Sequence, residues 1–584
     1  MTLSIRAVLT LTLSIVLSGC SAPTKPLVER SPAPAWSQGA MATAANPHAV
    51  EAAMTMLKQG GHAVDAAIAA HAVLGLVEPQ SSGLGGGGFM LVSEHGADLT
   101  FYDGREMAPA GVTVDMFMKD GEVMNFYEAW QSGIAVGVPG TVALYKRAHD
   151  EHGMLGWATL FAPAIKLASE GFIVSPRLAN YLPRMQKVSN LGKNPATAAY
   201  FYPNGVALKA GERLINTAYA ETLMRVANEG PQAFYSGEIA ANIVAAAQAE
   251  PNGGTLTTAD LAAYKVIKRP VICGDFRQSS ICTTAPPSSG GAQIMIAAMY
   301  DHMVTAESSQ ADKLAAFVDA QRLAYADRDH YFGDPDEVDI PLDDLLNPIY
   351  LKHRASERFA PAALPTPGDP ASVLGGSPLA TRWGTDTTQE AAGTTHLSII
   401  DNQGNAVSMT ATVEAPFGSS RWANGFLLNN EMTDFAREVA AEDERPANAI
   451  TPGRRPRSSM SPTMVFDKDG ELMMVTGSPG GNSIPAYVAK SILGVLDWQM
   501  DAQSVADFPN IVARGQKVRV EIADPAGKDI AKDLKLRGYD VLEREGENSG
   551  LHIIVVHPDR LDGAADNRRE GIVGEFMPPN EIPD

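Results

Sequence analysis

Two threonines that could take part in acyl-transfer chemistry face each other in a predicted β-hairpin. Residues 394–400 and 406–412 alternate with the period of two that is typical of strands, around the turn-forming residues 401–405. A five-residue loop pairs the strands so that Thr394 lies opposite Thr412 on one face of the sheet. The pair could form a nucleophile and the group that orients it. From the spacing alone, the alternative is a stabilising cross-strand pair that contributes roughly a few tenths of a kcal/mol.

Ordered segments of the chain resemble motifs of the gamma-glutamyltransferase family. From the hairpin onward they are Thr394-Thr395-His396 after Gly393, Leu428 to Phe435, Arg457 to Thr463 and Thr476 to Gly481. Before it, Gly83 to Met90, Tyr102 to Pro109 and Pro286 to Gly291 match the same family's large subunit. The similarity covers the chain from about residue 40 to its end, and so many ordered motifs do not agree by chance.

The resemblance implies a self-processing N-terminal-nucleophile hydrolase that forms two subunits from one precursor. Thr394 attacks the Gly393 carbonyl, the acyl group shifts from nitrogen to oxygen, and hydrolysis of the ester frees a new N-terminal threonine. Gly393 suits this step because it leaves the carbonyl unshielded and tolerates strained backbone angles. The implied fold is of the mixed α/β class, a four-layer αββα sandwich. Residues 41–393 would form the large subunit and residues 394–584 the small, catalytic subunit.

The expected chemistry places nucleophile and base on one residue. A threonine hydroxyl is a poor nucleophile at neutral pH, but an α-amino group with a pKa near 8 can take its proton. Thr412 resembles the family threonine that orients this hydroxyl. Gly480 and Gly481 match the family's oxyanion hole, since their backbone N–H groups have no side chain in the way. A plain turn is the alternative there. For His396 we expect a packing or hydrogen-bonding role, because the family does not use it as a base.

A γ-glutamyl substrate carries an α-carboxylate and an α-ammonium, and the motifs provide partners for both. Arg105 would bind the carboxylate through two parallel hydrogen bonds, helped by the hydroxyls of Ser458 and Ser459. Glu431 and Asp434 would hold the ammonium. The resemblance implies glutathione, its conjugates or glutamine as donors, and water, an amino acid or a short peptide as acceptor. It implies neither a metal nor an organic cofactor.

Two features depart from the family pattern. Glu414 stands where better-known members have an asparagine that contacts the substrate amino group. An additional carboxylate still suits a cation, but it leaves substrate preference open. The lid region between Asp434 and Arg457 is shortened, and residues 436–456 contain no tyrosine, so we expect a more open site.

Two other functions compete with this interpretation. A glutaryl acylase of the cephalosporin-acylase kind shares the fold and the self-cleavage, but its substrate lacks the α-ammonium, and Asp434 argues against it. A non-catalytic, unprocessed envelope lipoprotein would keep the fold as a binding module. The intact Gly393-Thr394 pair, Thr412 and the two glycines at 480–481 argue against that class.

The elements that must position these residues follow from hydrophobic periodicity. Apolar residues at helical spacing predict helices at 48–58, 62–76, 139–150, 157–170, 217–228, 236–248, 312–328 and 485–496. A second hairpin, 464–466 with 472–475, surrounds Asp469-Gly470, and a final strand pair is expected near 517–521 and 551–556. Residues 286–291 and 360–393 are poor in regular structure, and the second stretch runs directly into the strand of Thr394.

The glycine run at 83–88 formally contains the dinucleotide-binding pattern G-x-G-x-x-G. It follows a helix and precedes the apolar strand 89–92, which is the reverse of the context that a dinucleotide needs. We therefore expect a tight turn or close backbone packing there and no nucleotide.

The first residues predict export. Arg6, a short apolar stretch and then Leu17-Ser18-Gly19-Cys20 resemble a lipoprotein signal peptide at 1–19, with Cys20 as the lipidated residue. Residues 20–40 are interpreted as the anchored tether, because they are rich in Pro, Ser and Ala. The expected location is the periplasmic side of a bacterial envelope. An ordinary cleaved signal with an incidental cysteine is the alternative.

The net charge restricts the possible partners, and the two remaining cysteines bear on the compartment. The chain has 584 residues and a formal net charge of -21, so it has no basic face for a phosphate backbone, and nucleic acid is an unsuitable partner. A two-residue turn at 277–278 places Cys273 opposite Cys282 as a close, non-hydrogen-bonded pair. This pair could accept a disulfide in an exported protein, and two free buried thiols are the alternative.

Overall fold

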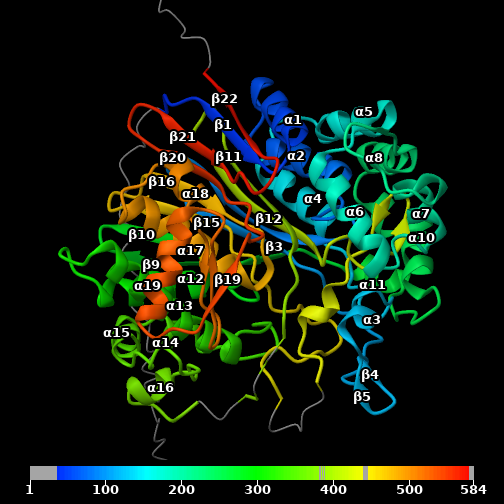
Figure 1. The fold of residues 1–584 in the computed structure, drawn as a ribbon. Helices are drawn as coiled ribbons and strands as arrows, with labels where there is room; N and C mark the ends of the chain where they lie inside the picture. Colours follow the sequence, from blue (N-terminus) through cyan, green and yellow to red (C-terminus); the bar gives the residue numbers. More distant parts are fainter. Residues whose placement is uncertain (1–35, 380–382, 385, 387, 439–444, 578–584) are drawn as a thin grey trace, which may run out of the picture. The chain divides into compact units, whose positions relative to one another are not determined.

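Two antiparallel sheets form the centre of the structure, a computed structural model that describes residues 36–577 except 380–382, 385, 387 and 439–444 (Figure 1). The first sheet has seven strands in the order β22-β1-β11-β12-β2-β3-β8. Their bounds are β1 Ala40–Ala44, β2 Gly87–Ser93, β3 Leu99–Gly104, β8 Ile267–Arg269, β11 Gly393–Ile400, β12 Ala406–Glu414 and β22 Ile572–Phe576. The second has six, in the order β21-β20-β16-β15-β10-β9. These are β9 Val271–Phe276, β10 Ser279–Thr284, β15 Thr463–Asp467, β16 Leu472–Gly477, β20 His552–Val556 and β21 Leu561–Ala565.

The predicted signal peptide, Cys20 and most of the expected tether lie outside the described residues, as does part of the expected lid region. None of the helices within the described ranges combines the length and the apolar composition that crossing a membrane would require.

Alternation along β11 decides which way the Thr394 side chain faces. Leu397 and Ile399 point into the apolar layer under the first helices, so the residues between them point to the other sheet. Hydrogen bonds join the two sheets on this inner side: Ser398 donates to the His552 carbonyl at 2.9 Å, and Ser408 donates to the Thr476 carbonyl at 3.0 Å. Thr394 shares the parity of Ser398. It therefore lies in the polar seam between the sheets.

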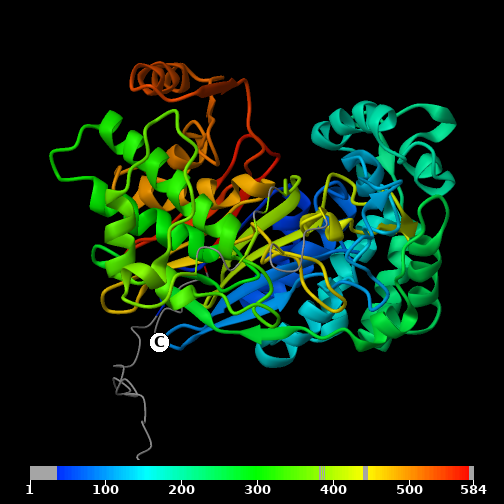
Figure 2. The same cartoon turned by 90° about the horizontal axis from the view of Figure 1, so that it is seen from below.

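Helices cover the outer face of each sheet, which gives the predicted αββα order (Figure 2). Helices α1 (Pro47–Lys58), α2 (Ala63–Val77) and α4 (Thr141–His152) pack on the seven-stranded sheet. On the six-stranded sheet lie α12 (Gly290–Met303) and α17 (Ile484–Leu496), with α13 (Gln310–Tyr331) against α12. Helix α1 begins where Asn46 accepts a hydrogen bond from the His48 N–H, and α2 begins at a capping box between His62 and Asp65.

Smaller elements complete the described chain. They are the helices α3 Phe126–Trp130, α5 Ala162–Glu170, α6 Pro176–Val188, α7 Pro195–Phe201, α8 Thr217–Glu229, α9 Gln232–Tyr235, α10 Gly237–Gln248, α11 Thr258–Ala263, α14 Leu342–Leu345, α15 Pro348–Ser356, α16 Pro370–Val373, α18 Ala502–Asp507 and α19 Pro525–Leu536, with short strand pairs β4 Met118–Lys119 with β5 Glu122–Val123, β6 Phe172–Ile173 with β7 Arg213–Leu214, and β13 Trp422–Ala423 with β14 Phe426–Leu427. Single 3-10 turns at Trp157–Phe161, Pro203–Gly205, Glu431–Asp434 and Gly481–Ser483 join some of them.

The structure confirms the predicted helices to within a few residues at each end, and it corrects two other expectations. The irregular stretch at 286–291 ends earlier than predicted, because Gly290 and Gly291 already form the first turn of α12. The strands near 517–521 and 551–556 are not a pair: β18 (Val518–Glu521) pairs with β17 (Ile511–Val512) and β19 (Val541–Arg544), whereas β20 belongs to the six-stranded sheet. Helix α19 makes a crossover between β18 and β19, and a parallel pair needs such a crossover.

The glycine run packs tightly against the hairpin of β11 and β12, as predicted. A Cβ atom on Gly86 would lie 1.9 Å from the Thr412 carbonyl oxygen, and one on Gly85 would lie 2.1 Å from that of Leu427. Only glycine permits this approach of the backbone to the end of β12.

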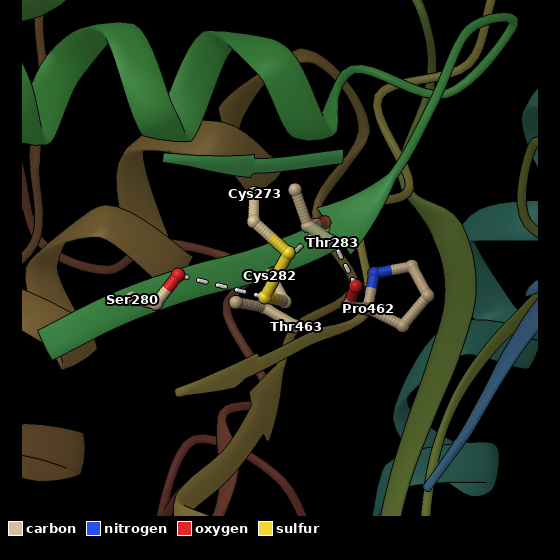
Figure 3. The surroundings of a disulfide bond; sticks show 6 residues. All are labelled: Cys273, Ser280, Cys282, Thr283, Pro462 and Thr463. Atoms are coloured by element: carbon tan, nitrogen blue, oxygen red, sulfur yellow. Dashed lines mark hydrogen bonds between the residues drawn. A yellow bond between two sulfur atoms is a disulfide. The ribbon is translucent and has the colours of Figure 1, made fainter. Parts of the chain in front are cut away.

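The two cysteines are joined across β9 and β10 (Figure 3). Cys273 faces Cys282 in the predicted register, and the two form a disulfide. Next to it, the Thr283 hydroxyl donates to the Pro462 carbonyl at 2.9 Å and so connects β10 to the segment that leads into β15 (Figure 3).

Candidate active site

The hairpin register brings Thr394 and Thr412 together as predicted. Their hydroxyl oxygens lie 3.2 Å apart. The Thr412 hydroxyl donates to the Gly393 carbonyl oxygen at 2.8 Å and accepts a hydrogen bond from the Glu414 N–H at 2.8 Å. A hydroxyl has a single proton, so Thr394 must be the donor in the contact with Thr412. Thr412 therefore contacts both the attacking oxygen and the carbonyl that it would attack.

A β-bulge lies at the bond before Thr394. The register shifts by one residue between Gly393 and Thr394, so that Gly393 pairs with Glu414. Glu414 has a φ of 75°, a left-handed conformation that a glutamate rarely adopts. A Cβ on Gly393 would come within 2.5 Å of the Ala415 backbone, so a side chain cannot fit there. The bend exposes the Gly393 carbonyl to the hydroxyls of Thr394 and Thr412.

Gly480 and Gly481 lie against the segment that precedes the bond. Their φ angles are 139° and 55°, and a Cβ on Gly481 would lie 2.5 Å from the Ala391 carbonyl oxygen. In the uncut chain the Gly393 oxygen accepts its hydrogen bond from Thr412. An oxyanion role for the two glycines therefore stays a prediction for the mature enzyme.

Arg569 is a site residue that the sequence did not predict. Arg569 donates to the Thr394 carbonyl oxygen at 3.0 Å and to the carbonyl of Ser549 at 3.1 Å. Burial, with the nearby Arg177 guanidinium, lowers the pKa of Arg569 to about 10. No spacing rule distinguishes this arginine from its neighbour Arg568, since only the fold brings residue 569 to residue 394.

The predicted substrate-binding residues Arg105, Glu431 and Asp434 form one buried cluster. Arg105 donates to Asp434 Oδ2 at 2.7 Å and makes an ion pair with Glu431 Oε1. Its remaining donors reach the backbone carbonyls of Pro456 at 3.2 Å and Arg457 at 2.9 Å. Arg105 and its two partners come from distant parts of the sequence, and the motif resemblance alone grouped them.

The cluster has more negative than positive groups. Glu106 and Glu414 adjoin Glu431 and Asp434, which sets several carboxyl groups against one guanidinium. Burial raises the pKa of Asp434, and the charges of Glu431 and Glu390 raise it further. Glu431 Oε2 and Asp434 Oδ1 have no hydrogen-bond partner among the residues that the structure describes. Buried carboxylate oxygens without donors are suited to a ligand that carries N–H groups and a positive charge.

The buried carboxyl group of Glu106 should make the stability of the uncut chain depend on pH. Burial raises its pKa to about 7, although Arg105 opposes the shift. Because the folded pKa is above the unfolded one, this contribution to stability is complete below about pH 4.5 and is lost as the pH rises through about 7. The uncut Thr394→Ala chain should lose on the order of 3 kcal/mol of its free energy of unfolding between these pH values. Adding Glu106→Gln to this chain should abolish the loss, as measured by urea unfolding. Equal pH dependence in the two chains would contradict the assignment.

Ser458, Ser459 and Glu414 are engaged with the protein itself in the uncut chain. The Ser459 N–H donates to Glu390 Oε2 at 2.9 Å. The Ser458 hydroxyl accepts a hydrogen bond from the Met460 N–H at 3.2 Å. Glu414 accepts one from the Ala391 N–H at 2.8 Å and another from the Asn430 side chain. Ser459 and Glu414 contact the segment that precedes Thr394, and all three residues are buried in this state.

His396 is enclosed by neighbours on its own hairpin. Its Nδ1 lies 2.8 Å from the Thr410 hydroxyl and its Nε2 lies 3.1 Å from the Ser398 hydroxyl. Burial, with His552 nearby, holds its pKa well below the ordinary value, so the ring is neutral. These contacts match the expected hydrogen-bonding role.

His62, Glu94 and His152 are spaced so that they could hold a metal ion, but at the opposite end of the first sheet. The N–H at the start of α2 donates to Asp401, which follows β11, so the group lies roughly 20 Å from Thr394 by strand geometry. His62 Nδ1 already accepts a backbone hydrogen bond, so in the neutral ring its Nε2 carries the proton and cannot bind a metal.

Comparison with known proteins assigns this arrangement to a family. The model of the family described as Gamma-glutamyltranspeptidase matches residues 49–576. The glutathione hydrolase proenzyme of Escherichia coli (strain K12) is 36% identical over 546 residues, covering 92% of this chain and 91% of the relative. That of Bacillus subtilis (strain 168) is 35% identical over 546 residues, covering 91% and 90%.

Solved structures show the same fold. A cephalosporin acylase from Bacillus halodurans aligns with a TM-score of 0.80 at 25% identity, covering 96% of this chain and 100% of that one. The gamma-glutamyltranspeptidase of Helicobacter pylori aligns with a TM-score of 0.51 at 31% identity, covering 54% of this chain and 90% of that one. The sequence relatives thus point to glutathione hydrolysis, and the structural neighbours include an acylase.

Proposed function

The chain belongs to the gamma-glutamyltranspeptidase family, and from this premise we propose that it is a self-processing glutathione hydrolase and gamma-glutamyltransferase with Thr394 as its nucleophile. It cleaves γ-glutamyl amides through a γ-glutamyl ester of Thr394. The acyl group then passes to water, an amino acid or a short peptide. The enzyme is a heterodimer of the two subunits formed from one precursor, residues 41–393 and 394–584.

The single observation that supports this substrate is the Arg105 cluster. An α-carboxylate needs a guanidinium, and an α-ammonium needs carboxylate oxygens, and both lie here in one buried site. A zwitterionic donor would use Arg105 for its carboxylate. The unpartnered oxygens of Glu431 and Asp434 would accept its ammonium hydrogens. Glu414 adds a further carboxylate to the same wall, and its pKa is raised by burial and by Asp434.

The contacts of the Thr394 and Thr412 hydroxyls with each other and with the Gly393 carbonyl support self-cleavage. Thr412 polarises the Gly393 carbonyl, and the Thr394 oxygen attacks its carbon to give a tetrahedral intermediate. The carbon–nitrogen bond then breaks as the proton of the Thr394 hydroxyl passes to the nitrogen, which leaves an ester on the Thr394 oxygen and a free α-amino group on Thr394. Water then hydrolyses the ester. The large subunit ends in a Gly393 carboxylate, and the small subunit begins with Thr394.

In the mature enzyme the new α-amino group acts as the base. It takes the proton of the Thr394 hydroxyl as this oxygen attacks the γ-carbonyl of the substrate, and it returns a proton to the leaving amine. Gly480 and Gly481 would donate N–H groups to the oxyanion. A cavity of about 990 Å³, lined by Ala391, Ala392 and Gly480 among others, gives the leaving group room beside this point.

A glutaryl acylase is the second candidate, and the Bacillus halodurans structure favours it as a fold neighbour. A glutaryl group has no ammonium, so it would leave Glu431 Oε2 and Asp434 Oδ1 without a hydrogen-bond donor. The acidity of the cluster therefore favours the γ-glutamyl substrate. We also retain the proposal that Cys20 carries a lipid anchor on the periplasmic side of the envelope, on the basis of the leader sequence.

One preparation of the full-length protein, made in a bacterial host, tests the cleavage, the anchor and the substrate. Intact mass should show two chains, a small one beginning at Thr394 and a large one beginning at a diacylglyceryl Cys20. The protein should release the chromophore from a γ-glutamyl anilide at least a hundredfold faster than from a glutaryl anilide. An uncut chain would refute self-processing, the reverse preference would favour the acylase, and an unmodified large chain would refute the anchor.

A further inference from the structure

The side chain of Glu390, four residues before Thr394, lies in a buried anion site. Its Oε1 is 2.5 Å from Arg328 Nη2, and its Oε2 accepts the Ser459 N–H at 2.9 Å. Arg457 Nε lies 3.6 Å from Oε1. Arg328 and Arg457 are fully buried, and Glu390 is 9% exposed. Two guanidinium groups and one backbone N–H thus converge on one carboxylate.

The charges around this site balance only when a carboxylate fills it. Asp329 pairs with Arg328 at 2.8 Å and with Arg514 at 2.8 Å, and Asp386 pairs with Arg457 at 2.8 Å. The three guanidinium groups are thus matched by two aspartates and the Glu390 carboxylate. Without Glu390 one buried positive charge has no counter-ion, which is costly in a protein interior. Although burial acts to raise the pKa of Glu390, the two arginines and Ser459 hold it below the ordinary value.

Glu390 is also the charged anchor of the cleavage segment. Each following residue is held by one hydrogen bond: the Ala391 N–H to Glu414 at 2.8 Å, the Ala392 carbonyl from Asn548 at 3.1 Å, and the Gly393 carbonyl from Thr412 at 2.8 Å. The backbone N–H of Glu390 donates to the side chain of Asn482. The hydrogen bonds from Asn548 and Thr412 join neutral groups, so they are weaker than the charge-assisted contact of Glu390 with arginine. The position of the Gly393 carbonyl therefore depends on the Glu390 carboxylate.

We propose that Arg328, Arg457 and Ser459 form a carboxylate-binding site which the uncut chain fills with its own Glu390, so that Glu390 positions the Gly393 carbonyl for attack by Thr394. The inference rests on the proposed self-cleavage. Ser459 belongs to the motif expected to bind the substrate carboxylate, so the site closes the uncut chain to substrate. Release of the segment after cleavage opens it. Glu390 is a positioning residue, since it touches no reacting atom.

The test follows the rate of self-cleavage during cell-free synthesis of the full chain, by gel and intact mass. Glu390→Gln and Glu390→Ala should slow conversion at least tenfold, and Glu390→Asp should restore part of the rate. Glu545→Gln is the matched control, because it removes the same charge from an exposed position and should cut at the wild-type rate.

Chemical rescue tests the site itself. Acetate is a free carboxylate small enough for the space left in Glu390→Ala, and it should accelerate cleavage of this variant severalfold. Acetamide, which has the same shape without the charge, should have no effect, and neither should sodium chloride at equal ionic strength. Thermal unfolding of the uncut Glu390→Ala/Thr394→Ala chain checks that the variant folds.

The outcomes separate this inference from the proposed function. A wild-type chain that stays uncut refutes self-processing. If the wild-type chain cuts and both Glu390→Gln and Glu390→Ala cut at the same rate, the positioning role is overturned but self-processing is not. Slow cleavage that neither aspartate nor acetate relieves also overturns it, because the defect would then be general and would not come from a missing carboxylate.

Discussion

Thr394→Ala is expected to remain a single chain and to lose its activity on γ-glutamyl amides. The methyl side chain has no oxygen to attack the Gly393 carbonyl, and without cleavage no free α-amino group appears. Loss of a nucleophile in an acyl-transfer enzyme lowers the rate by roughly 10⁴ to 10⁶. Gel electrophoresis and intact mass measure the cleavage, and release of the anilide chromophore measures the activity.

Thr395→Ala is the matched control for this experiment. Thr395 is the same residue type at the next position of β11, is buried on the opposite face of the strand, and has a hydroxyl without a hydrogen-bond partner among the described residues. We expect Thr395→Ala to cut and to keep its activity. If Thr394→Ala still gave a small chain beginning at residue 394, the hydroxyl would not be the cleaving group. If both variants stayed uncut, the defect would lie in the packing of the hairpin.

The second large effect is expected from Asp434→Asn. This change keeps the shape of the side chain but removes one negative charge from the group that would face the substrate ammonium. Truncation of a buried charge pair costs about 2–5 kcal/mol, so kcat/KM for a γ-glutamyl anilide should fall by roughly 30-fold to 5,000-fold. A glutaryl anilide has no ammonium, so its slow hydrolysis should change little. The two substrates measured on the same cut protein give the result as a ratio.

Cleavage has to be checked first in this variant, because Asp434 pairs with Arg105 in the uncut chain. Only protein that shows two chains by intact mass is used for the kinetics. Equal losses for the two substrates would show that Asp434 supports the site as a whole. An unchanged γ-glutamyl rate would place the ammonium elsewhere and would return weight to an acylase function.

The choice between the two substrates depends on the charge of the site, because the fold does not distinguish them. The Bacillus halodurans acylase aligns over nearly the whole chain, and the E. coli glutathione hydrolase proenzyme is the more similar in sequence. The same sandwich thus supports both chemistries. In this chain Glu106, Glu431 and Asp434 all lie beside Arg105, and this local excess of carboxyl groups is the feature that a glutaryl group could not use.

Features that depend on neighbours along the chain could be predicted from the residues alone. Alternation and a five-residue loop were enough to place Thr394 opposite Thr412, and a two-residue turn did the same for Cys273 and Cys282. In both cases hydrogen bonding within one hairpin fixes the register. The bulge at Gly393 was not predicted, because it depends on how Glu414 and Ala415 leave the sheet.

Contacts between residues far apart in the sequence became visible in the folded structure. It brought Arg569 to the Thr394 carbonyl and Glu390 to Arg328 and Arg457, and it assigned the strands at 518–521 and 552–556 to different sheets. A lone arginine or glutamate has no periodicity that reveals its partner. Its role appears when burial removes water and leaves the charge with the few groups that the packed layers place beside it.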